Sequence, residues 1–483
     1  MKLSALLNGV GEISPSQDVE IENVTDKLSE VKKNTLFVCI DGDSFDGNDF
    51  ITYAARKGAV AFVSERQVKA KISVRVPSAR KALSVIAANF YGNPANKLKI
   101  IGITGTNGKT TTSFLVRHIL EFSGKKCGLT GTVQKFTGEK SVSSTLTTPE
   151  PMELQKAFSE MLENGCEYCA SEISSQALAQ SRAEGVHFCA AAISNITPEH
   201  LNYHLNMENY ISSKLLLFEN CDFAVLNIDD KNISNNESKI NCRKFTVSLK
   251  ERLADYFAEN IVSTSGGVEF DLLHDKIYKA AIPLPGIYNV YNALCAVAIC
   301  SGLGIETPAC IEALASFKGV EGRCERVPIN RDFSVIIDYA HTPDGFENII
   351  SSAREFTKNR IITVFGCGGD RDKSKRSVMG KIAGGLSDAV IVTDDNPRTE
   401  NPVRIICDIL EGLGKTKCHY AVVSDRKDAI GLALKIAEKD DTVLILGKGH
   451  EKYQITANGK IPFDEKKIIQ EFLKQDEKIW NSH

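Results

Sequence analysis

The chain has 483 residues, more than a single hydrophobic core normally organises, so we expect two or three domains. Hydrophobic residues make up 42% and charged residues 25%, values typical of a globular protein and unlike those of a disordered chain. The 58 Lys and Arg residues nearly balance the 61 Asp and Glu residues, which leaves a net charge of −3. This balance excludes an overall positive field for nucleic acid, and we expect no nucleic-acid partner.

The start of the chain has one lysine and a short apolar stretch before Asn8, too short for the apolar region of a secretory signal. No run approaches the roughly 18 apolar residues of a membrane span. The 14 cysteines are scattered, and Cys166 and Cys169 lack a second pair at zinc-site spacing, so we interpret them as small buried residues beside a strand. These features predict a reduced, cytoplasmic protein of enzyme size without a membrane span.

Residues 1–97 are predicted to form a small α/β domain. A helical pattern from Ser78 to Tyr91 ends at Gly92-Asn93-Pro94, a helix stop signal that we interpret as a linker. The earlier elements are a strand at Thr35–Ile40, a helix at Asp49–Lys57 and a strand at Ala59–Val63.

Residues 98–325 are predicted to form a central domain. It opens with a strand at Leu98–Thr104, a glycine-containing turn and a helix from Thr110 to about Phe122. Helical stretches separate the later strands, a pattern that favours a mainly parallel, doubly wound sheet. The polar segment Asp229–Ser238 is expected to be a surface loop. The later strands are expected at Tyr168–Ile173, Phe188–Ile196 and Phe223–Ile228.

Residues 326–483 are predicted to form a third α/β domain. Each of its strands runs directly into a polar or glycine-rich cluster, and the carboxyl ends of parallel strands meet at one edge of a sheet. We therefore expect one composite site there, with four unrelated polar loops as the alternative. The strands are predicted at Ser334–Asp338, Ile361–Phe365, Ala389–Thr393 and Thr442–Leu446.

The segment from Gly102 to Thr111 has the character of a phosphate-binding loop. Glycines let backbone N–H groups approach phosphates closely, and the following helix N-terminus favours negative charge. Lys109 is expected to reach the β- and γ-phosphates of a nucleotide and Thr110 to bind magnesium. Five residues rather than four separate Gly102 from Gly108, so an ordinary strand–helix turn is the alternative.

A set of motifs between about residues 100 and 455 resembles the Mur ligases, ATP-dependent amide-bond-forming enzymes of cell-wall synthesis. The set occurs in the family's order, which makes it specific as a whole. Its members here are GTNGKTT at 105–111, SEISS at 171–175, SNITPEHLNYH at 194–204, Lys214, LPGIYNVYN at 284–292, DYAHTPDG at 338–345, FGCGGDRDKSKR at 365–376, DDNPR at 394–398 and GKGHE at 447–451.

The resemblance implies three α/β domains, with a central phosphate-loop domain and a Rossmann-like C-terminal domain. Residues 1–97 would bind a UDP-sugar peptide, 98–325 ATP and 326–483 an amino acid. Within the family, the motifs are most similar to those of the ligase that adds a diamino acid to UDP-MurNAc-L-Ala-D-Glu. ATP would convert the D-Glu side-chain carboxylate to an acyl phosphate, and an amine would then displace the phosphate.

The resemblance also implies a catalytic group of Lys109, Glu172, His200 and Lys214. Thr110 and Glu172 would hold magnesium, and His200 would hold a second magnesium. Lys214 would be carboxylated on its amine by carbon dioxide, because an anionic carbamate suits a magnesium ion whereas an ammonium does not. Taken without the family, the sequence favours a strand-end surface carboxylate for Glu172, a packed loop histidine for His200 and a solvated helix lysine for Lys214.

Further residues follow from the resemblance as ligands of the two nucleotide substrates. Asn292 would contact adenine, Arg323 the γ-phosphate and Asp338 the ribose, with His341 nearby. The ATP site would comprise Gly105, Thr106, Asn107, Gly108, Lys109, Thr110, Thr111, Asn292, Arg323, Asp338 and His341. The UDP-MurNAc-dipeptide site would comprise Thr147, Thr148, Ser174, Gln180 and Arg182, since hydroxyls and an arginine suit a diphosphate and carboxylates.

The DDNPR motif matches the version found in ligases that add meso-diaminopimelate. That amino acid has a distal carboxylate, which lysine lacks, and an arginine fork binds a carboxylate in bidentate fashion. Arg398 would bind this carboxylate, and Glu451 the distal ammonium. The expected diaminopimelate site is Arg371, Asp395, Asn396, Pro397, Arg398, Gly447 and Glu451.

Two segments depart from the family pattern. Near the N-terminus the family usually has an Asp-Ser-Arg segment that contacts the uridine end, whereas this chain has Val24-Thr25-Asp26-Lys27-Leu28-Ser29. In the His200 segment, Glu199 and Asn202 stand where aspartates are usual and Leu205 where glycine is common. These changes flank the expected ligand and do not replace it.

Other functions remain open from the sequence. The same ligase using L-lysine would lack an arginine at position 398, and a folate polyglutamylating ligase would leave DDNPR and residues 1–97 unexplained. A phosphate-loop ATPase without amide chemistry would give Glu172, His200 and Lys214 no joint role. We expect a monomer that uses ATP and magnesium, with UDP-MurNAc-L-Ala-D-Glu and meso-diaminopimelate as substrates.

Overall fold

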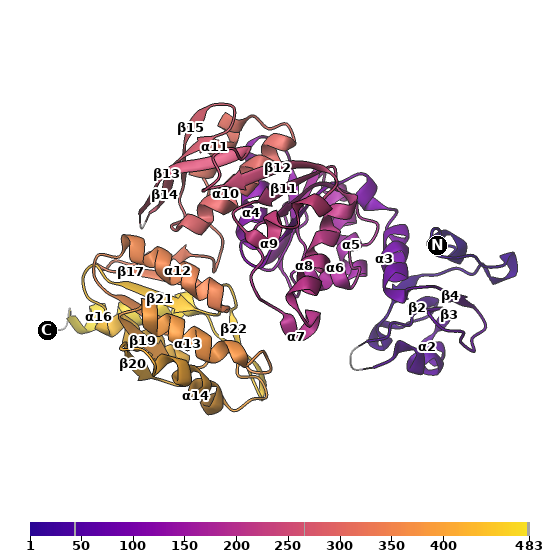
Figure 1. Cartoon of the computed structure of the whole chain (residues 1–483). Coiled ribbons are helices and arrows are strands. Elements are labelled where there is room, and N and C mark those ends of the chain that lie inside the picture. The colour runs from indigo at the N-terminus through magenta and orange to yellow at the C-terminus, as the bar shows by residue number, and fades with distance from the viewer. Residues whose placement is uncertain (43–44, 265, 481–483) are drawn as a thin grey trace. The chain divides into compact units, whose positions relative to one another are not determined.

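The computed structural model describes residues 1–42, 45–264 and 266–480 (Figure 1). The chain forms two compact units: most of residues 1–246 lie in the first and most of residues 247–480 in the second, with segment 197–202 belonging to the second and 295–309 to the first. The predicted domain borders after residues 97 and 325 stay predictions. Among the described residues, no helix is both long enough and apolar enough to span a bilayer.

The N-terminal part of the first unit has a four-stranded parallel sheet in the order β1-β2-β3-β4. Helix α3 begins after Ser78, whose side chain accepts a hydrogen bond from the Lys81 backbone N–H, and it buries Leu83 and Ile86 against the sheet. The strands are β1 Asn23–Thr25, β2 Thr35–Val38, β3 Ala59–Ser64 and β4 Ser73–Arg75, and the helices are α1 Leu3–Leu6, α2 Ile51–Lys57 and α3 Ala79–Phe90.

The central sheet of the first unit has the order β12-β11-β10-β5-β9-β6-β7-β8. Strands β11, β10, β5, β9 and β6 are parallel, and their apolar runs are buried as expected of a sheet covered on both faces. The strands are β5 Lys99–Thr104, β6 Cys127–Thr130, β7 Gln134–Phe136, β8 Ser141–Ser143, β9 Tyr168–Glu172, β10 Phe188–Ile193, β11 Phe223–Asn227 and β12 Arg243–Ser248. The helices are α4 Lys109–Phe122, α5 Pro151–Glu163, α6 Ser175–Ala179, α7 Leu201–His204, α8 Met207–Leu215 and α9 Lys231–Ser234.

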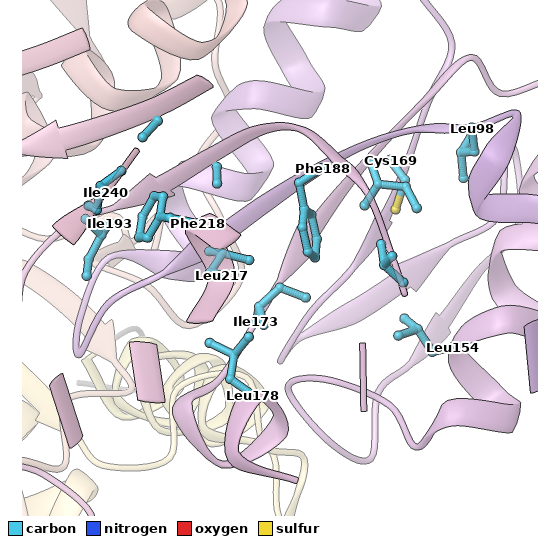
Figure 2. Packing of buried hydrophobic residues seen from close by; sticks show 14 of the residues in the cluster. Leu98, Leu154, Cys169, Ile173, Leu178, Phe188, Ile193, Leu217, Phe218 and Ile240 are labelled. Atoms are coloured by element: carbon cyan, nitrogen blue, oxygen red, sulfur yellow. The ribbon is translucent and has the colours of Figure 1, made fainter. Parts of the chain in front are cut away.

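One core cluster of this sheet joins α5, β9, β10 and the segment after α8. Figure 2 shows Cys169, Phe188 and Leu217 among its buried side chains. Cys166 belongs to the same cluster, and burial raises the pKa of both the Cys166 and the Cys169 thiol. The interpretation of these two cysteines as small buried residues is therefore confirmed.

An antiparallel extension of strands after residue 248 was not predicted from the sequence. Strands β13 Tyr256–Thr264, β14 Gly267–Leu273 and β15 Ile277–Ile282 follow β12, and β13–β14 and β14–β15 pair antiparallel. The expected loop Asp229–Ser238 also contains a single helical turn, α9, because the Asp230 carboxylate accepts hydrogen bonds from the Asn232 and Ile233 N–H groups.

The second unit contains a six-stranded sheet in the order β16-β17-β21-β18-β19-β20. Alternate residues of its parallel strands face opposite layers of helices. One face packs on α12, α13 and α14, which lie together in the orange part of Figure 1, and the other packs on α15 and α16. The predicted α/β class with mainly parallel sheets is confirmed.

The bounds in this unit agree closely with the strands expected from the sequence. The strands are β16 Glu325–Arg326, β17 Ser334–Asp338, β18 Ile361–Phe365, β19 Ala389–Val392, β20 His419–Val422, β21 Thr442–Leu446, β22 Tyr453–Thr456 and β23 Gly459–Pro462. The helices are α12 Pro343–Phe356, α13 Ser374–Leu386, α14 Pro402–Leu413, α15 Arg426–Ile436 and α16 Glu465–Trp480. Helices α10 Ile287–Gly302 and α11 Thr307–Ala315 are divided between the two units, because residues 295–309 belong to the first. The carboxyl ends of β17, β18, β19 and β21 carry the four predicted clusters.

Candidate functional site

The segment after β5 forms a tight loop that leads into α4. Gly105 and Gly108 both have positive φ angles, 145° and 86°. A Cβ at Gly105 would overlap the Ser194 hydroxyl, so only glycine fits there. Asn195 braces the loop, because its backbone carbonyl accepts from the Thr106 N–H at 2.9 Å and its side-chain oxygen from the Asn107 N–H at 2.8 Å.

The Lys109 ammonium folds over this loop. Its Nζ atom donates to the backbone carbonyls of Gly105 at 2.8 Å and Thr106 at 2.9 Å. A cation is therefore held at the helix N-terminus, where the backbone N–H groups also favour negative charge. This arrangement fits a loop that binds the phosphates of a nucleotide.

Glu172 lies at the end of β9 beside the first turn of α4. Its carboxylate is fully buried and accepts hydrogen bonds from the hydroxyls of Thr110 at 3.0 Å and Thr132 at 2.8 Å, and from the Thr132 backbone N–H at 3.0 Å. A Cβ at Gly131 would overlap the Glu172 carboxylate. Glu172 is thus a buried carboxylate packed next to the loop, and the alternative of a surface carboxylate is wrong.

The five residues expected to bind the UDP-sugar peptide lie in one network with Glu172. The Thr148 hydroxyl donates to the Glu172 backbone carbonyl at 2.9 Å and accepts from the Ser174 N–H at 3.0 Å. Arg182 donates to the Thr148 carbonyl at 2.9 Å and to the Gln180 side-chain oxygen at 2.7 Å. The Thr147 hydroxyl lies 3.1 Å from that of Thr132, so hydroxyls and one guanidinium line the edge beyond β9.

Lys214, on α8, is 1% exposed and is not the solvated helix lysine that the local pattern allowed. Its Nζ atom donates to the Gly105 carbonyl at 2.8 Å and lies 4.7 Å from the centre of the Tyr210 ring. The Tyr210 hydroxyl in turn lies 3.0 Å from the Thr106 hydroxyl. Helix α8 therefore places the amine of Lys214 directly against the phosphate loop.

His200 belongs to the second unit by its contacts and has a φ of 54°, in the left-handed region. Its Nε2 atom lies 3.7 Å from the Glu199 carboxylate, and its side chain is 44% exposed, so it is not a packed loop histidine. Leu205, which stands where the family has glycine, has a φ of 72° and is 79% exposed. The departure at Leu205 thus retains a backbone conformation that favours glycine.

No group of three or more His, Cys, Asp and Glu side chains is placed to hold a metal ion in the part of the chain whose side chains are described, residues 1–42, 45–264 and 266–474. Thr110 and Glu172 form a smaller set, of one hydroxyl and one carboxylate. Their oxygens are the hard ligands that magnesium prefers.

In the second unit, Arg323, Asp338 and Tyr339 lie together at the end of β17. The Arg323 guanidinium lies 4.5 Å from the centre of the Tyr339 ring, and Tyr339 also contacts the rings of His341 and His450. The Asp338 carboxylate accepts from the Cys324 and Ala340 N–H groups, and burial raises its pKa. Burial also lowers the pKa of His450 to about 4, with the positive charge of Arg323 adding to the effect, so His450 is neutral at pH 7.

Two other expected nucleotide ligands are held by neighbouring polar groups. The Asn292 amide, on α10, is buried and donates to the Asn289 side-chain oxygen at 3.0 Å. The His341 Nδ1 atom lies 2.9 Å from the Tyr339 carbonyl, and the Lys375 ammonium donates to the His341 carbonyl at 2.8 Å. Lys375 belongs to the FGCGGDRDKSKR motif, so that motif directly supports the loop after β17.

The loops after β18 and β19 touch along their backbones. A Cβ at Gly369 would overlap the Pro397 carbonyl, which explains why a glycine run follows β18. Arg398 has a φ of 53° and donates from Nη1 to the Gly369 carbonyl at 2.7 Å. A Cβ at Gly368 would lie 2.9 Å from this Nη1 atom and 3.7 Å from the Arg371 Cγ atom, so both expected arginines flank one glycine.

A buried arginine fixes the outer part of these loops. Arg376, 1% exposed, pairs with the Glu400 carboxylate at 2.9 Å and with Asp408 at 2.8 Å, and donates to the Gly368 carbonyl at 3.2 Å. The hydrogen bonds from Arg376 lower the pKa of Glu400 to about 2. Glu400 also accepts from the Asp370 N–H at 2.6 Å, so this cluster joins the β18 loop to the β19 loop.

The remaining expected amino-acid ligands meet between the loops after β19 and β21. The Asn396 amide donates to the Glu451 carboxylate at 2.8 Å. A Cβ at Gly447, where φ is 113°, would lie 3.3 Å from the Asp395 carboxylate. The buried ammonium of Lys448 contacts Asp395, Asn396 and Glu451.

The structure therefore brings the expected residues together within each unit. In the first unit the phosphate loop, Glu172, Lys214 and the five expected sugar-peptide ligands are linked, and in the second unit all seven expected amino-acid ligands lie on the loops after β18, β19 and β21. Sequence reasoning missed Thr132, Tyr210, Arg376 and Lys448. Arg376 and Lys448 lie inside quoted motifs. For Lys448, which stands two residues beyond β21, a charged residue close to a buried strand was the available signal.

Three segments of the chain match models of the Mur ligase family. Residues 20–91 match its "Mur ligase family, catalytic domain", residues 103–300 its "Mur ligase middle domain" and residues 322–449 its "Mur ligase, glutamate ligase domain".

Curated relatives are similar to the chain over nearly its full length. A UDP-N-acetylmuramoyl-L-alanyl-D-glutamate–2,6-diaminopimelate ligase 1 of Clostridium acetobutylicum is 46% identical over 98% of this chain and 100% of its own length. A ligase of the same name from Clostridioides difficile is 44% identical over 98% of this chain and 99% of its own length.

Solved structures share the fold over nearly the whole chain. A structure of a UDP-N-acetylmuramoyl-L-alanyl-D-glutamate–2,6-diaminopimelate ligase has a TM-score of 0.70 and 27% identity, covering 99% of this chain and 100% of that chain. The MurF ligase from Thermotoga maritima in complex with ADP has a TM-score of 0.63 and 18% identity, covering 96% and 100%. From its relatives and its matched segments, this chain belongs to the Mur ligase family.

Proposed function

We propose that the chain catalyses the ATP-dependent addition of meso-2,6-diaminopimelate to the D-Glu side-chain carboxylate of UDP-MurNAc-L-Ala-D-Glu, in the synthesis of peptidoglycan precursors. The observation that carries the proposal is the similarity, at 46% identity over 98% of the chain, to a relative named for this reaction. The amino-acid ligands gathered on the loops after β18, β19 and β21 support it.

The phosphate loop would bind and orient ATP for transfer of its γ-phosphoryl group. Backbone N–H groups at the start of α4 and the Lys109 ammonium would stabilise the charge that builds on the transferring phosphoryl group. Arg323 would hold the γ-phosphate, Asp338 the ribose and Asn292 the adenine. The half-buried Tyr339 ring, which contacts Arg323 and the neutral His450, would help to hold the guanidinium in place.

Thr110 and Glu172 would hold magnesium through their oxygens, and His200 and Lys214 would hold a second magnesium ion. Magnesium, when bound, offsets the negative charge of the phosphates. The fit rests on Glu172, whose buried carboxylate accepts hydrogen bonds from two hydroxyls and one backbone N–H and offers the hard oxygens that magnesium prefers. These neutral donors also fix its orientation toward the loop.

We also propose that carbon dioxide carboxylates Lys214. The modification would give the side chain anionic oxygens, which suit magnesium where an ammonium does not. Its support is position: α8 holds the Lys214 amine in a buried site against the phosphate loop. A lysine with only a structural role on a helix would ordinarily extend its amine into water.

The sugar-peptide substrate would lie along the network beyond β9. The hydroxyls of Thr147, Thr148 and Ser174 and the guanidinium of Arg182 would bind its phosphates and carboxylates. Because Thr148 bonds directly to the backbone of Glu172, the acceptor carboxylate would be bound next to the residues that hold the phosphates.

The distal end of diaminopimelate would lie between Arg398 and Glu451. The guanidinium would bind its carboxylate and the glutamate its ammonium, while Asp395 and Asn396 would bind nearby polar atoms. L-Lysine lacks the carboxylate and would leave the Arg398 fork without its ligand. We place the reaction in the cytoplasm, where ATP is available, and expect a monomer, which light scattering would test.

The test is phosphate release from ATP and magnesium with UDP-MurNAc-L-Ala-D-Glu, comparing meso-diaminopimelate with L-lysine. We expect release with diaminopimelate alone, together with a tripeptide product detected by mass. Release with lysine alone would retain a ligase and contradict the role of Arg398. No release with either amino acid, from a protein that binds ATP, would contradict the proposed function.

A further inference from the structure

Lys448 has no role in the proposed reaction, although it lies two residues beyond β21 and between two expected ligands, Gly447 and Glu451. Its side chain is fully buried. Burying a charged ammonium is unfavourable unless partners compensate for the lost water, so a lysine at this place requires an explanation.

The partners of Lys448 are three residues of the expected amino-acid site. Its Nζ atom lies 3.2 Å from the Asp395 carboxylate, 3.0 Å from the Asn396 side-chain oxygen and 3.4 Å from the Glu451 carboxylate. An ammonium has three N–H donors, so these three acceptors match its capacity. Strand β18 separates β21 from β19 in the sheet, and Lys448 therefore joins two loops that are not on adjacent strands.

The contacts also fix the orientation of the Asn396 amide. Its oxygen accepts from Lys448 and from the Ile455 N–H at 2.8 Å, and its amino group donates to Glu451 at 2.8 Å. Rotation of this amide by half a turn would place its N–H groups against the Lys448 ammonium and the Ile455 N–H. The lysine thus determines that Asn396 presents its donors to Glu451.

The charges of this cluster do not cancel. One ammonium faces two carboxylates, those of Asp395 and Glu451, which leaves one negative charge. The Asp395 side chain is 8% exposed and that of Glu451 is 15% exposed, whereas Lys448 is 0% exposed. The Glu451 carboxylate is therefore the most exposed charged group of the cluster, and the Lys448 ammonium is the most deeply buried.

We infer that Lys448 is a positioning residue for the amino-acid substrate: it holds Asp395, Asn396 and Glu451 in one arrangement and leaves them a single negative charge for the ammonium of the substrate. This inference rests on the proposed function. Without Lys448, two carboxylates would share a buried site and would repel each other or take up a proton. Either change would weaken binding of an ammonium group.

The test is Lys448→Met in the full chain, with Lys435→Met as the matched control, because Lys435 is an exposed lysine of α15 in the same unit. We expect the KM for meso-diaminopimelate to rise at least about tenfold in Lys448→Met, with the KM for ATP changing less than about twofold. A merely structural role would lower the yield or the thermal midpoint and leave the two KM values in their wild-type ratio. The control should match the wild type in both.

A second measurement does not depend on the reaction. Hydrogen exchange should become faster at residues 394–400 and 447–452 in Lys448→Met than in the wild type, and remain unchanged in β5 and α4. If the methionine variant does not fold, Lys448→Gln, which keeps an N–H donor, should show the same direction with a smaller effect. Unchanged exchange together with an unchanged KM would overturn the inference, whereas a wild type inactive with diaminopimelate would overturn the proposed function.

Discussion

At the end of β9 the Glu172 carboxylate is held by neutral donors, two hydroxyls and one backbone N–H, whereas at the end of β19 the Asp395 carboxylate is held by the buried ammonium of Lys448. Neutral donors orient a carboxylate and leave its full charge for a cation. The Lys448 ammonium offsets one of the two negative charges of Asp395 and Glu451 and leaves a single negative charge. The first arrangement suits a doubly charged metal ion, and the second suits the single charge of an amino acid.

The largest effect is expected from Lys214→Ala, which removes a proposed ligand of the second magnesium ion in the same unit as Glu172. Loss of an essential anionic ligand should lower kcat by about a thousandfold or more. Formate or acetate should restore part of the activity, because a short carboxylate can take the place of the carbamate. The measurement is ligation rate against carboxylate concentration.

Lys239→Ala is the matched control for Lys214→Ala, since Lys239 is an exposed lysine of the same unit. It should retain the wild-type rate and show no response to formate. Full activity of Lys214→Ala without any carboxylate would contradict the proposed role of Lys214.

Arg398→Ala should have the next largest effect, because it removes a guanidinium from the expected amino-acid site after β19. A charge-assisted hydrogen bond contributes roughly 1.5–3 kcal/mol, so kcat/KM for diaminopimelate should fall about ten- to a hundredfold. The KM for ATP should stay near its wild-type value. Arg404→Ala, at an exposed arginine of α14, is the control, and equal losses in both variants would refute a specific role for Arg398.

Thr132→Ala tests whether neutral donors orient Glu172. Removing one hydroxyl that bonds to a buried carboxylate should lower kcat about tenfold and raise the magnesium concentration needed for half-maximal rate. Thr132→Ser keeps the hydroxyl and should behave nearly as the wild type. A serine variant as impaired as the alanine variant would indicate that shape, rather than the hydrogen bond, is what matters.

The smallest effect concerns stability and comes from Glu400. Hydrogen bonds from Arg376 lower the Glu400 pKa from 4.5 to about 2 in the folded state. The stabilisation is therefore fully present above pH 4.5 and is lost as the pH falls from 4.5 toward 2. Thermal midpoints measured through this range should fall less steeply in Glu400→Gln than in the wild type, and parallel curves would contradict the assigned pair.

The sequence predicted those parts of the molecule whose signals are local. The phosphate loop and the strand ends of the second unit were found because apolar runs lead directly into glycine or polar clusters. The β13–β15 extension was missed, because these strands lie between the quoted motifs and their buried residues do not form the continuous apolar runs that marked the other strands. Lys448 and Arg376 were visible in the sequence, but their roles depend on distant partners: Glu400 lies 24 residues from Arg376, and Asp395 lies 53 residues from Lys448.

The long separation between Lys448 and Asp395 has a consequence for folding kinetics. The two side chains meet only after β18, β19 and β21 have docked side by side. Bringing together two residues that are 53 positions apart is slow compared with forming a helix. Until then, the ammonium and both carboxylates keep their water. Dehydration of this cluster should therefore be among the last steps by which the second unit folds, so that a chain interrupted within α15 would acquire much of its secondary structure without acquiring this amino-acid site.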